Sequence, residues 1–219
     1  FPAYAPVKIV GANYNNFPYA LGTNKNTEEF IPSGKCSGHG LYFADESDLS
    51  HFANIGYGDK VAHIKLLEEE AIWVEDNKCK TNQFEIVRIE PIEEYISNLS
   101  VEKQMKYIQQ DGCMLRHIKN PTKKQHLEAV KQNGVAIQFI KNPSEQVQLE
   151  AVRQNGYVIQ CIKCPSEQVQ LEAVRQNGHA IEYIENPSEQ VQLAAENYTH
   201  RQGRRKWFEQ NMSNRTCNF

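Results

Sequence analysis

Apolar and polar positions in the second half of the chain recur with a period of 22 residues. The clearest copy starts at Asn142 and reads NPSEQVQLEAVRQNGYVIQCIK, and the copy that follows it shares the segment PSEQVQLEAVRQNG. The first copy is degenerate and the last loses the pattern at Asn197; the five copies begin at Asn98, Asn120, Asn142, Cys164 and Asn186. Self-similarity at a fixed period is typical of repeat architectures, so we expect one structural unit per copy.

Each copy carries its own signals for the start and the end of a helix. Asn142 is a good N-cap, Pro143 suits the first helical position, and Glu145 falls where a capping-box acid reaches back to the cap. Apolar side chains then lie along one side of the helix, at Val147, Leu149, Ala151 and Val152. We expect Gly156 to end the helix, because glycine adopts the left-handed conformation that satisfies the last carbonyls.

A second, shorter helix is predicted after the glycine, with Ile159 and Ile162 three residues apart. Isolated helices of fewer than roughly 12–15 residues are marginal in water, so each hairpin must pack on its neighbours and form a solenoid. One predicted core ladder holds Met105, Leu127, Leu149, Leu171 and Leu193, and another holds Ile118, Ile140, Ile162 and Ile184. A glutamine precedes each glycine turn, and a hydrogen bond between copies is a hypothesis for Gln110, Gln132, Gln154 and Gln176.

Two positions of the second helix vary from copy to copy and lie on the same face of it. One position holds Cys113, Val135, Tyr157 and His179, and the other holds His117, Phe139, Cys161 and Tyr183. These side chains either line a groove that selects a partner or adapt the packing between copies, and both interpretations stay open. The candidate binding residues are Tyr157, His179, His117, Phe139 and Tyr183.

Residues 1–97 show a different pattern, which predicts a small α+β domain of mostly antiparallel strands with one helix. Asp45 to Ser47 supply helix N-caps, and Leu49, Phe52 and Ala53 form a helical face. On the strand at 61–67, Ala62, Ile64 and Leu66 share one side. The predicted strands span residues 8–10, 40–44, 61–67, 71–74 and 84–89.

The copies resemble a short helical tandem repeat of unknown function, with the motif N-P-S-E-x-V-Q-L-x-A-V-x-Q-N-G, that is found in proteins of giant viruses, protists and some bacteria. The resemblance covers roughly residues 98–195 and implies a helical scaffold without an assigned activity. The N-terminal segments Gly40-Leu41-Tyr42-Phe43 and Lys80-Thr81-Asn82 resemble the N-terminal module of giant-virus ankyrin-repeat proteins. That resemblance implies a viral or host-interaction protein.

A shorter segment, from Gly38 to Ala44 with the following Ser47 and Ser50, resembles the second-strand motif of ADP-ribosyltransferases. The resemblance implies that Tyr42 stacks on the nicotinamide of NAD and that Glu85 binds ribose hydroxyls and stabilises the oxocarbenium-like centre. This sequence lacks the His or Arg that the family carries on its first strand, because neither type occurs between Phe1 and Lys35.

Charge is distributed unevenly, with 8 Lys and Arg against 15 Asp and Glu in residues 1–97, and 5 basic residues against Glu209 in residues 198–219. A strong basic face, which duplex-binding proteins usually show, is absent, so nucleic acid could be contacted only through the tail residues Arg201, Arg204, Arg205 and Lys206. The irregularly spaced cysteines indicate reduced thiols in the cytoplasm. The zinc-like pair Cys161 and Cys164 has no second pair, so we expect no metal site.

The chain starts at Phe1 without a signal peptide, and its missing initiator Met suggests a processed or partial protein. It contains no long apolar run, so we expect no membrane partner. We predict an acidic α+β domain at 1–97, helical repeats at 98–197 and a basic tail at 198–219. The leading hypothesis is an intracellular protein–protein interaction scaffold without a cofactor. The alternative is an NAD-using ADP-ribosyltransferase or NAD glycohydrolase with its site in the N-terminal domain.

Overall fold

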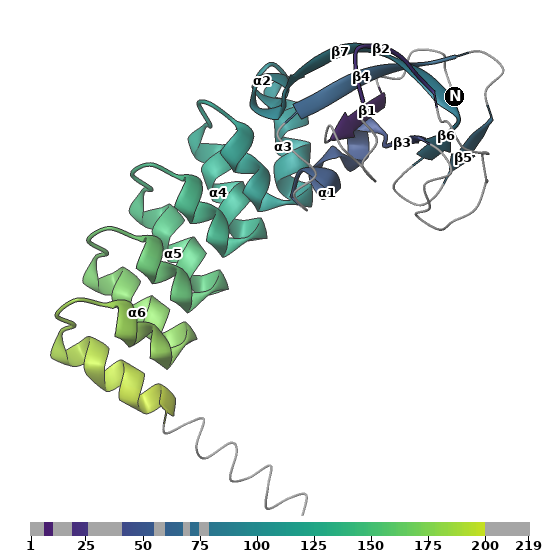
Figure 1. The fold of residues 1–219 in the computed structure, drawn as a ribbon. Coiled ribbons are helices and arrows are strands. Elements are labelled where there is room, and N and C mark those ends of the chain that lie inside the picture. The colour runs from purple at the N-terminus through teal and green to yellow at the C-terminus, as the bar shows by residue number, and fades with distance from the viewer. Residues whose placement is uncertain are drawn as a thin grey trace, which may run out of the picture. The chain divides into compact units, whose positions relative to one another are not determined.

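A computed structural model describes residues 7–10, 19–25, 41–54, 60–67, 71–74 and 79–199 of the 219-residue chain (Figure 1). The chain forms two compact units, Phe1–Pro121 and Thr122–Phe219. The first unit contains antiparallel sheets followed by helices, and the second is built from helical hairpins, so the predicted α+β class is confirmed.

Two antiparallel sheets make up the first part of unit 1. The larger has the strand order β1-β4-β7-β2 and the smaller has the order β3-β6-β5. The strands are β1 (Val7–Val10), β2 (Gly22–Lys25), β3 (Leu41–Phe43), β4 (Lys60–Leu66), β5 (Ile72–Val74), β6 (Cys79–Thr81) and β7 (Gln83–Pro91). All five strands predicted from the sequence are present, whereas β2 and β6 were not predicted.

One apolar core joins the two sheets. The ring of Phe43 meets that of Phe84 edge-on at 6.2 Å between centroids, and the Tyr19 ring stacks on Phe84 at 5.8 Å. Ala62 and Ile64 of β4 are buried in this core and Leu66 packs against it, as the alternation along β4 predicts. Asp45 caps the 3-10 helix η2 (Glu46–Asp48), which leads into α1 (Leu49–Asn54).

The first repeat copy belongs to unit 1, although the sequence places a boundary at residue 97. It forms α3 (Val101–Gln110) and the 3-10 helix η3 (Gly112–His117), and it follows the unpredicted helix α2 (Ile92–Ser97). Gln110 accepts a hydrogen bond from Ser50 Oγ at 2.7 Å and donates to Ser47 O at 3.2 Å. These bonds attach the degenerate copy to the η2–α1 segment.

Unit 2 stacks hairpins made of one α-helix and one 3-10 helix (Figure 1). Neighbouring α-helices contact each other and neighbouring 3-10 helices contact each other, which gives an α layer and a 3-10 layer. The elements are α4 (Lys123–Gln132), η4 (Gly134–Phe139), α5 (Glu145–Gln154), η5 (Gly156–Cys161), α6 (Glu167–Gln176), η6 (Gly178–Tyr183) and a helix at 189–199. The expected stacking of sequence neighbours is confirmed in this unit.

The helix starts differ from the prediction. Ser144, not Asn142, is the N-cap of α5, and its Oγ accepts from Val147 N at 3.4 Å. Asn142 has a φ of 62° instead, in the left-handed region that asparagine tolerates better than most residues. The helix therefore begins after Pro143, and Glu145 makes no capping box. In unit 2, the box is formed at α4, by Thr122 and Gln125.

The glycine turn is also explained differently from the prediction. Asn155, with a φ of −153°, ends α5 in extended conformation, and its Oδ1 accepts from Tyr157 N at 3.0 Å to start η5. A Cβ on Gly156 would lie 2.6 Å from the carbonyl oxygen of Ala173 in the next hairpin. Glycine is needed here because two hairpins approach closely, and not because the backbone turns left-handed.

Of the two predicted core ladders, the isoleucine ladder is confirmed and the leucine ladder is not. Ile118, Ile140, Ile162 and Ile184 are buried, as predicted. The leucine ladder is wrong as a core ladder, because its members from Met105 to Leu171 are half-buried and Leu193 is 57% exposed. In α5 the buried side chains are Val147, Ala151 and Val152, and Leu149 lies at the border of this face.

Candidate functional site

Aromatic and aliphatic side chains emerge from the 3-10 layer at the two positions that vary between copies. Val135 is 36% exposed, Tyr157 37% and Tyr183 45%, while Phe139 is half-buried. The Tyr157 and Tyr183 rings, from η5 and η6, meet edge-on at 5.9 Å between centroids. We call Val135, Phe139, Tyr157 and Tyr183 the exposed row. Their neighbours on the same helices are buried, among them Val158 and Ile159, so the outward residues vary while the inward ones form the core.

The two candidate histidines lie in different surroundings. His179 is exposed at the start of η6, and its Nδ1 lies 3.5 Å from Glu182 Oε1. His117 is half-buried in unit 1, where its Nε2 accepts from Arg116 Nε at 2.9 Å. Its buried Nδ1 has no hydrogen-bond partner among the residues that the structure describes. Burial, followed by the charge of Arg116, lowers the pKa of His117 to about 4. His117 is therefore a neutral, packed side chain.

The structure does not bring Tyr42 and Glu85 together. Tyr42 lies on β3 of the smaller sheet and Glu85 on β7 of the larger one. Their sequence neighbours Phe43 and Phe84 face each other in the core, and successive side chains on a strand point to opposite faces. Tyr42 and Glu85 therefore point away from each other.

Tyr42 is only 6% exposed, which leaves little of its ring for a ligand. Its backbone N–H donates to Tyr19 Oη at 3.3 Å, and Lys80 Nζ lies 5.4 Å from the centre of its ring. Lys80 itself is 1% exposed. Tyr42 thus serves as a packed strand residue in this geometry, and no specific observation favours the NAD hypothesis.

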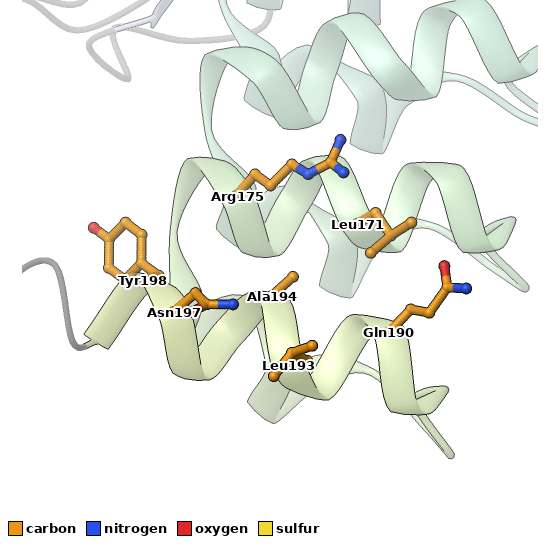
Figure 2. Close-up of a pocket in the computed structure, with 7 residues that line it drawn as sticks. All are labelled: Leu171, Arg175, Gln190, Leu193, Ala194, Asn197 and Tyr198. Carbon is orange, nitrogen blue, oxygen red and sulfur yellow. The ribbon is translucent and has the colours of Figure 1, made fainter.

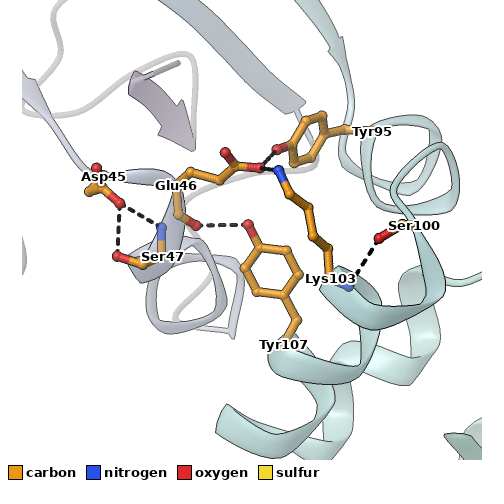
Figure 3. A network of polar contacts seen from close by, with 7 residues as sticks. All are labelled: Asp45, Glu46, Ser47, Tyr95, Ser100, Lys103 and Tyr107. Atoms are coloured by element: carbon orange, nitrogen blue, oxygen red, sulfur yellow. Dashed lines mark hydrogen bonds and ion pairs between the residues drawn. The ribbon is translucent and has the colours of Figure 1, made fainter. Parts of the chain in front are cut away.

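Reasoning from the sequence missed a polar network around Glu46 (Figure 3). Glu46 Oε1 accepts a hydrogen bond from Tyr95 and lies 3.5 Å from Lys103 Nζ, and Glu46 O accepts from Tyr107 Oη at 2.8 Å. Asp45 Oδ1 accepts from Ser47 N at 2.9 Å. Burial, the largest cause, raises the pKa of Tyr95 and of Tyr107, so both phenols stay protonated.

A shallow cavity of about 240 Å³ adjoins this network, lined by Asp45, Glu46, Ser47, Lys103, Lys106, Tyr107 and Gln110. Lys103 pairs with Glu46, and Tyr95 and Tyr107 both donate to Glu46, so the network fastens η2 to α2 and α3 within unit 1. The bonds from Tyr95 and Tyr107 to Glu46 join residues far apart in the chain, so no local sequence motif predicts them.

A larger cavity, of about 620 Å³, lies between α6 and the helix at 189–199 (Figure 2). We call it the end groove. Both helices contribute to its lining, which consists of Leu171, Arg175, Gln190, Leu193, Ala194, Asn197 and Tyr198. The sequence held a signal for it, because Ala194 stands where earlier copies have Glu150 and Glu172.

Cys161 and Cys164 are exposed free thiols, and Cys164 takes the left-handed conformation with a φ of 49°. Among the described residues, no group of three or more His, Cys, Asp or Glu could hold a metal ion, and no helix is long and apolar enough to cross a membrane. The tail residues Arg201, Arg204, Arg205 and Lys206 lie outside the described residues.

Comparison with known proteins gives no family assignment. No family model, no curated protein and no solved structure matches the chain.

Proposed function

We propose that this chain is a protein–protein interaction scaffold that binds another protein through the exposed row. The observation that carries the proposal is the repeated exposure of aromatic and aliphatic side chains on consecutive 3-10 helices, at Val135, Tyr157 and Tyr183. Contiguous apolar groups on a surface mark interaction sites, and tyrosine is enriched among the residues that dominate binding energy.

The hairpins hold these side chains in a fixed spacing. Asn133, Asn155 and Asn177 each start a 3-10 helix by accepting a hydrogen bond from the N–H two residues later, at 3.0–3.1 Å. Tyr157 and His179 provide two of those N–H groups, so the variable position sits at the same point of every hairpin. A partner can then be selected by changing a few outward residues without disturbing the core.

The remaining features of the proposal come from the sequence. Reduced thiols support a site of action inside the cell, in the cytoplasm. The resemblance to repeats and modules of giant-virus proteins supports a viral or host-modulating role. The partner is another protein, and no cofactor is needed for binding by a preformed surface.

The test uses the full chain as bait in an extract of the organism that encodes it. The wild type is compared with a variant carrying Tyr157→Ser and Tyr183→Ser, which removes about 2–4 kcal/mol of contact if both tyrosines are central to the interface. A matched control carries Gln146→Ser and Gln168→Ser, exposed positions on the α layer. We expect the tyrosine variant to lose specific proteins that the wild type and the control capture. Equal capture by all three would contradict the proposal.

A further inference from the structure

The ion pair that joins α5 to α6 has no counterpart between α6 and the helix at 189–199 among the described residues. Between α5 and α6, Arg153 Nε donates to Glu172 Oε1 at 3.1 Å, with 53% and 29% of the two side chains exposed. The same spacing from Arg175 leads to Ala194 in the next helix. Arg175 lines the end groove, and among the described residues no carboxylate pairs with it.

The end groove combines this guanidinium with apolar walls. Figure 2 shows Arg175 and Leu171 on α6, and Leu193, Ala194 and Tyr198 on the following helix, around one cavity. Leu193 is 57% exposed, although its equivalents in earlier copies are half-buried. The volume of about 620 Å³ lies within the range of roughly 300–1,000 Å³ that ligand sites occupy.

We propose that the end groove binds an acidic peptide segment of a partner protein. A Glu or Asp side chain of the peptide takes the place that Glu172 has opposite Arg153 and pairs with Arg175. An adjacent apolar side chain of the peptide packs on Leu171 and Leu193. The Arg153–Glu172 pair supports this assignment. Arg153 occupies the position in α5 that Arg175 occupies in α6, and it reaches a carboxylate on the following helix.

Leucine walls favour a peptide over a phosphate polymer. A phosphodiester chain is bound through several cations, whereas the described lining offers one arginine beside Leu171, Leu193, Ala194 and Tyr198. Arginine pairs well with a carboxylate through two parallel N–H groups, and the nearby apolar surface reduces competition from water. This site uses the α layer, so it goes beyond the exposed row and does not depend on it.

The experiment measures fluorescence anisotropy of a labelled peptide of alternating Leu and Glu, titrated with the full chain. We expect saturable binding that weakens at high salt, and a loss of about tenfold or more for the isosteric peptide of Leu and Gln. A single-stranded oligonucleotide of equal charge serves as the competing class. Tighter binding of the oligonucleotide, or no saturable binding of the Leu–Glu peptide, would overturn the proposal.

Three variants locate the site. Ala194→Glu restores the internal carboxylate and fills the groove, and Arg175→Gln removes the cation, so each should weaken peptide binding by about tenfold or more. Arg153→Gln is the matched control, because it alters the equivalent arginine on α5, away from the end groove, and it should bind as the wild type does. If Arg153→Gln weakens binding as much as Arg175→Gln, the site is not the end groove. The Tyr157→Ser and Tyr183→Ser variant should keep peptide binding, so failure here and failure of the exposed row are distinguishable.

Discussion

The first and the last helices of the 22-residue pattern differ in how the residue at one equivalent position contacts its surroundings. In α3, Gln110 bonds to Ser47 and Ser50 of the α+β part. In α6, the equivalent Gln176 accepts from Gly156 N of the preceding hairpin at 2.8 Å. In the helix at 189–199 the equivalent residue is Tyr198, whose ring lies against Gly178.

This difference shows what a repeat helix requires of its neighbours. At this position α3 bonds to the η2–α1 segment and α6 bonds to the preceding hairpin, so either kind of element can support a helix of the pattern. Terminal repeats of solenoids need a cap, and unit 1 provides one for its own hairpin through Gln110 and through Arg116, which donates to Ala53 O at 2.8 Å. The last described helix instead leaves Leu193 exposed.

The largest expected effect is a difference in stability loss between the same substitution in η5, an inner hairpin, and in η6, the last one. Ile159 is 1% exposed, whereas the equivalent Ile181 is partly exposed. Ile159→Ala should lower the free energy of unfolding by about 3 kcal/mol, because it leaves a cavity in a tightly packed position. Ile181→Ala should cost roughly half as much. Urea unfolding followed by circular dichroism measures both, and equal losses would contradict the difference between inner and terminal hairpins.

A second comparison uses the glycines. A Cβ at Gly156 meets the backbone carbonyl of Ala173 at 2.6 Å, so Gly156→Ala should force neighbouring hairpins apart and cost about 2 kcal/mol. A Cβ at Gly178 meets the side chain of Tyr198, which belongs to the last described helix and can shift, so Gly178→Ala should cost less than about 1 kcal/mol. Thermal unfolding of both variants measures the two losses of stability. A larger loss for Gly178→Ala than for Gly156→Ala would contradict the prediction.

The glutamine bonds allow a third comparison. Gln176→Met keeps the size of the side chain but leaves Gly156 N without its acceptor, and should cost about 1–2 kcal/mol. Gln154→Met is the control, because no hydrogen bond of the Gln154 side chain is seen in the described structure, and it should cost less than about 0.5 kcal/mol. Amide hydrogen exchange should show faster exchange at Gly156 in the first variant only. Unchanged protection there would show that the bond is not formed in solution.

The smallest effect concerns pH and the first hairpin. Burial lowers the pKa of His117 from 6.5 to about 4, so between these values the unfolded chain takes up a proton that the folded chain does not. Stability contributed by neutral His117 is therefore present above pH 6.5 and lost as the pH falls toward 4. His117→Phe copies Phe139 of the next hairpin and should flatten this dependence in urea unfolding at a series of pH values.

Some acid sensitivity should persist in that variant. Burial also lowers the pKa of His126, so its contribution has the same sign. An unchanged slope in the His117→Phe variant would mean that His117 is accessible and protonates equally in both states.

The sequence predicted the hairpins well because their signals are local and repeated. It placed the N-cap at Asn142 instead of Ser144, since both are good caps and only the φ of 62° at Asn142 distinguishes them. It gave the glycine the wrong reason, because a close approach of the Ala173 carbonyl depends on stacking. The strand β2, with the sequence GTNK, has no apolar alternation and forms through pairing with β7.

The candidate sites were less accessible to prediction. The varying positions drew attention to Tyr157 and Tyr183, and the structure shows these rings in contact and exposed. It also shows that His117 is packed and that Tyr42 and Glu85 diverge, which depends on strand pairing in space. The prediction of the end groove depends on one position, where Ala194 replaces the glutamate of earlier copies. The effect of this change is clear only from the structure, which shows that Glu172 pairs with Arg153.

Helices α5 and α6 consist of the same ten residues, EQVQLEAVRQ. Each surface that one of them offers can therefore be offered by the other. Duplication or loss of one period in the gene would change the length of the array while creating no unfamiliar interface. The same equivalence lets one copy occupy the place of its twin in a folding chain, which makes looped-out or exchanged hairpins a characteristic folding error of identical repeats.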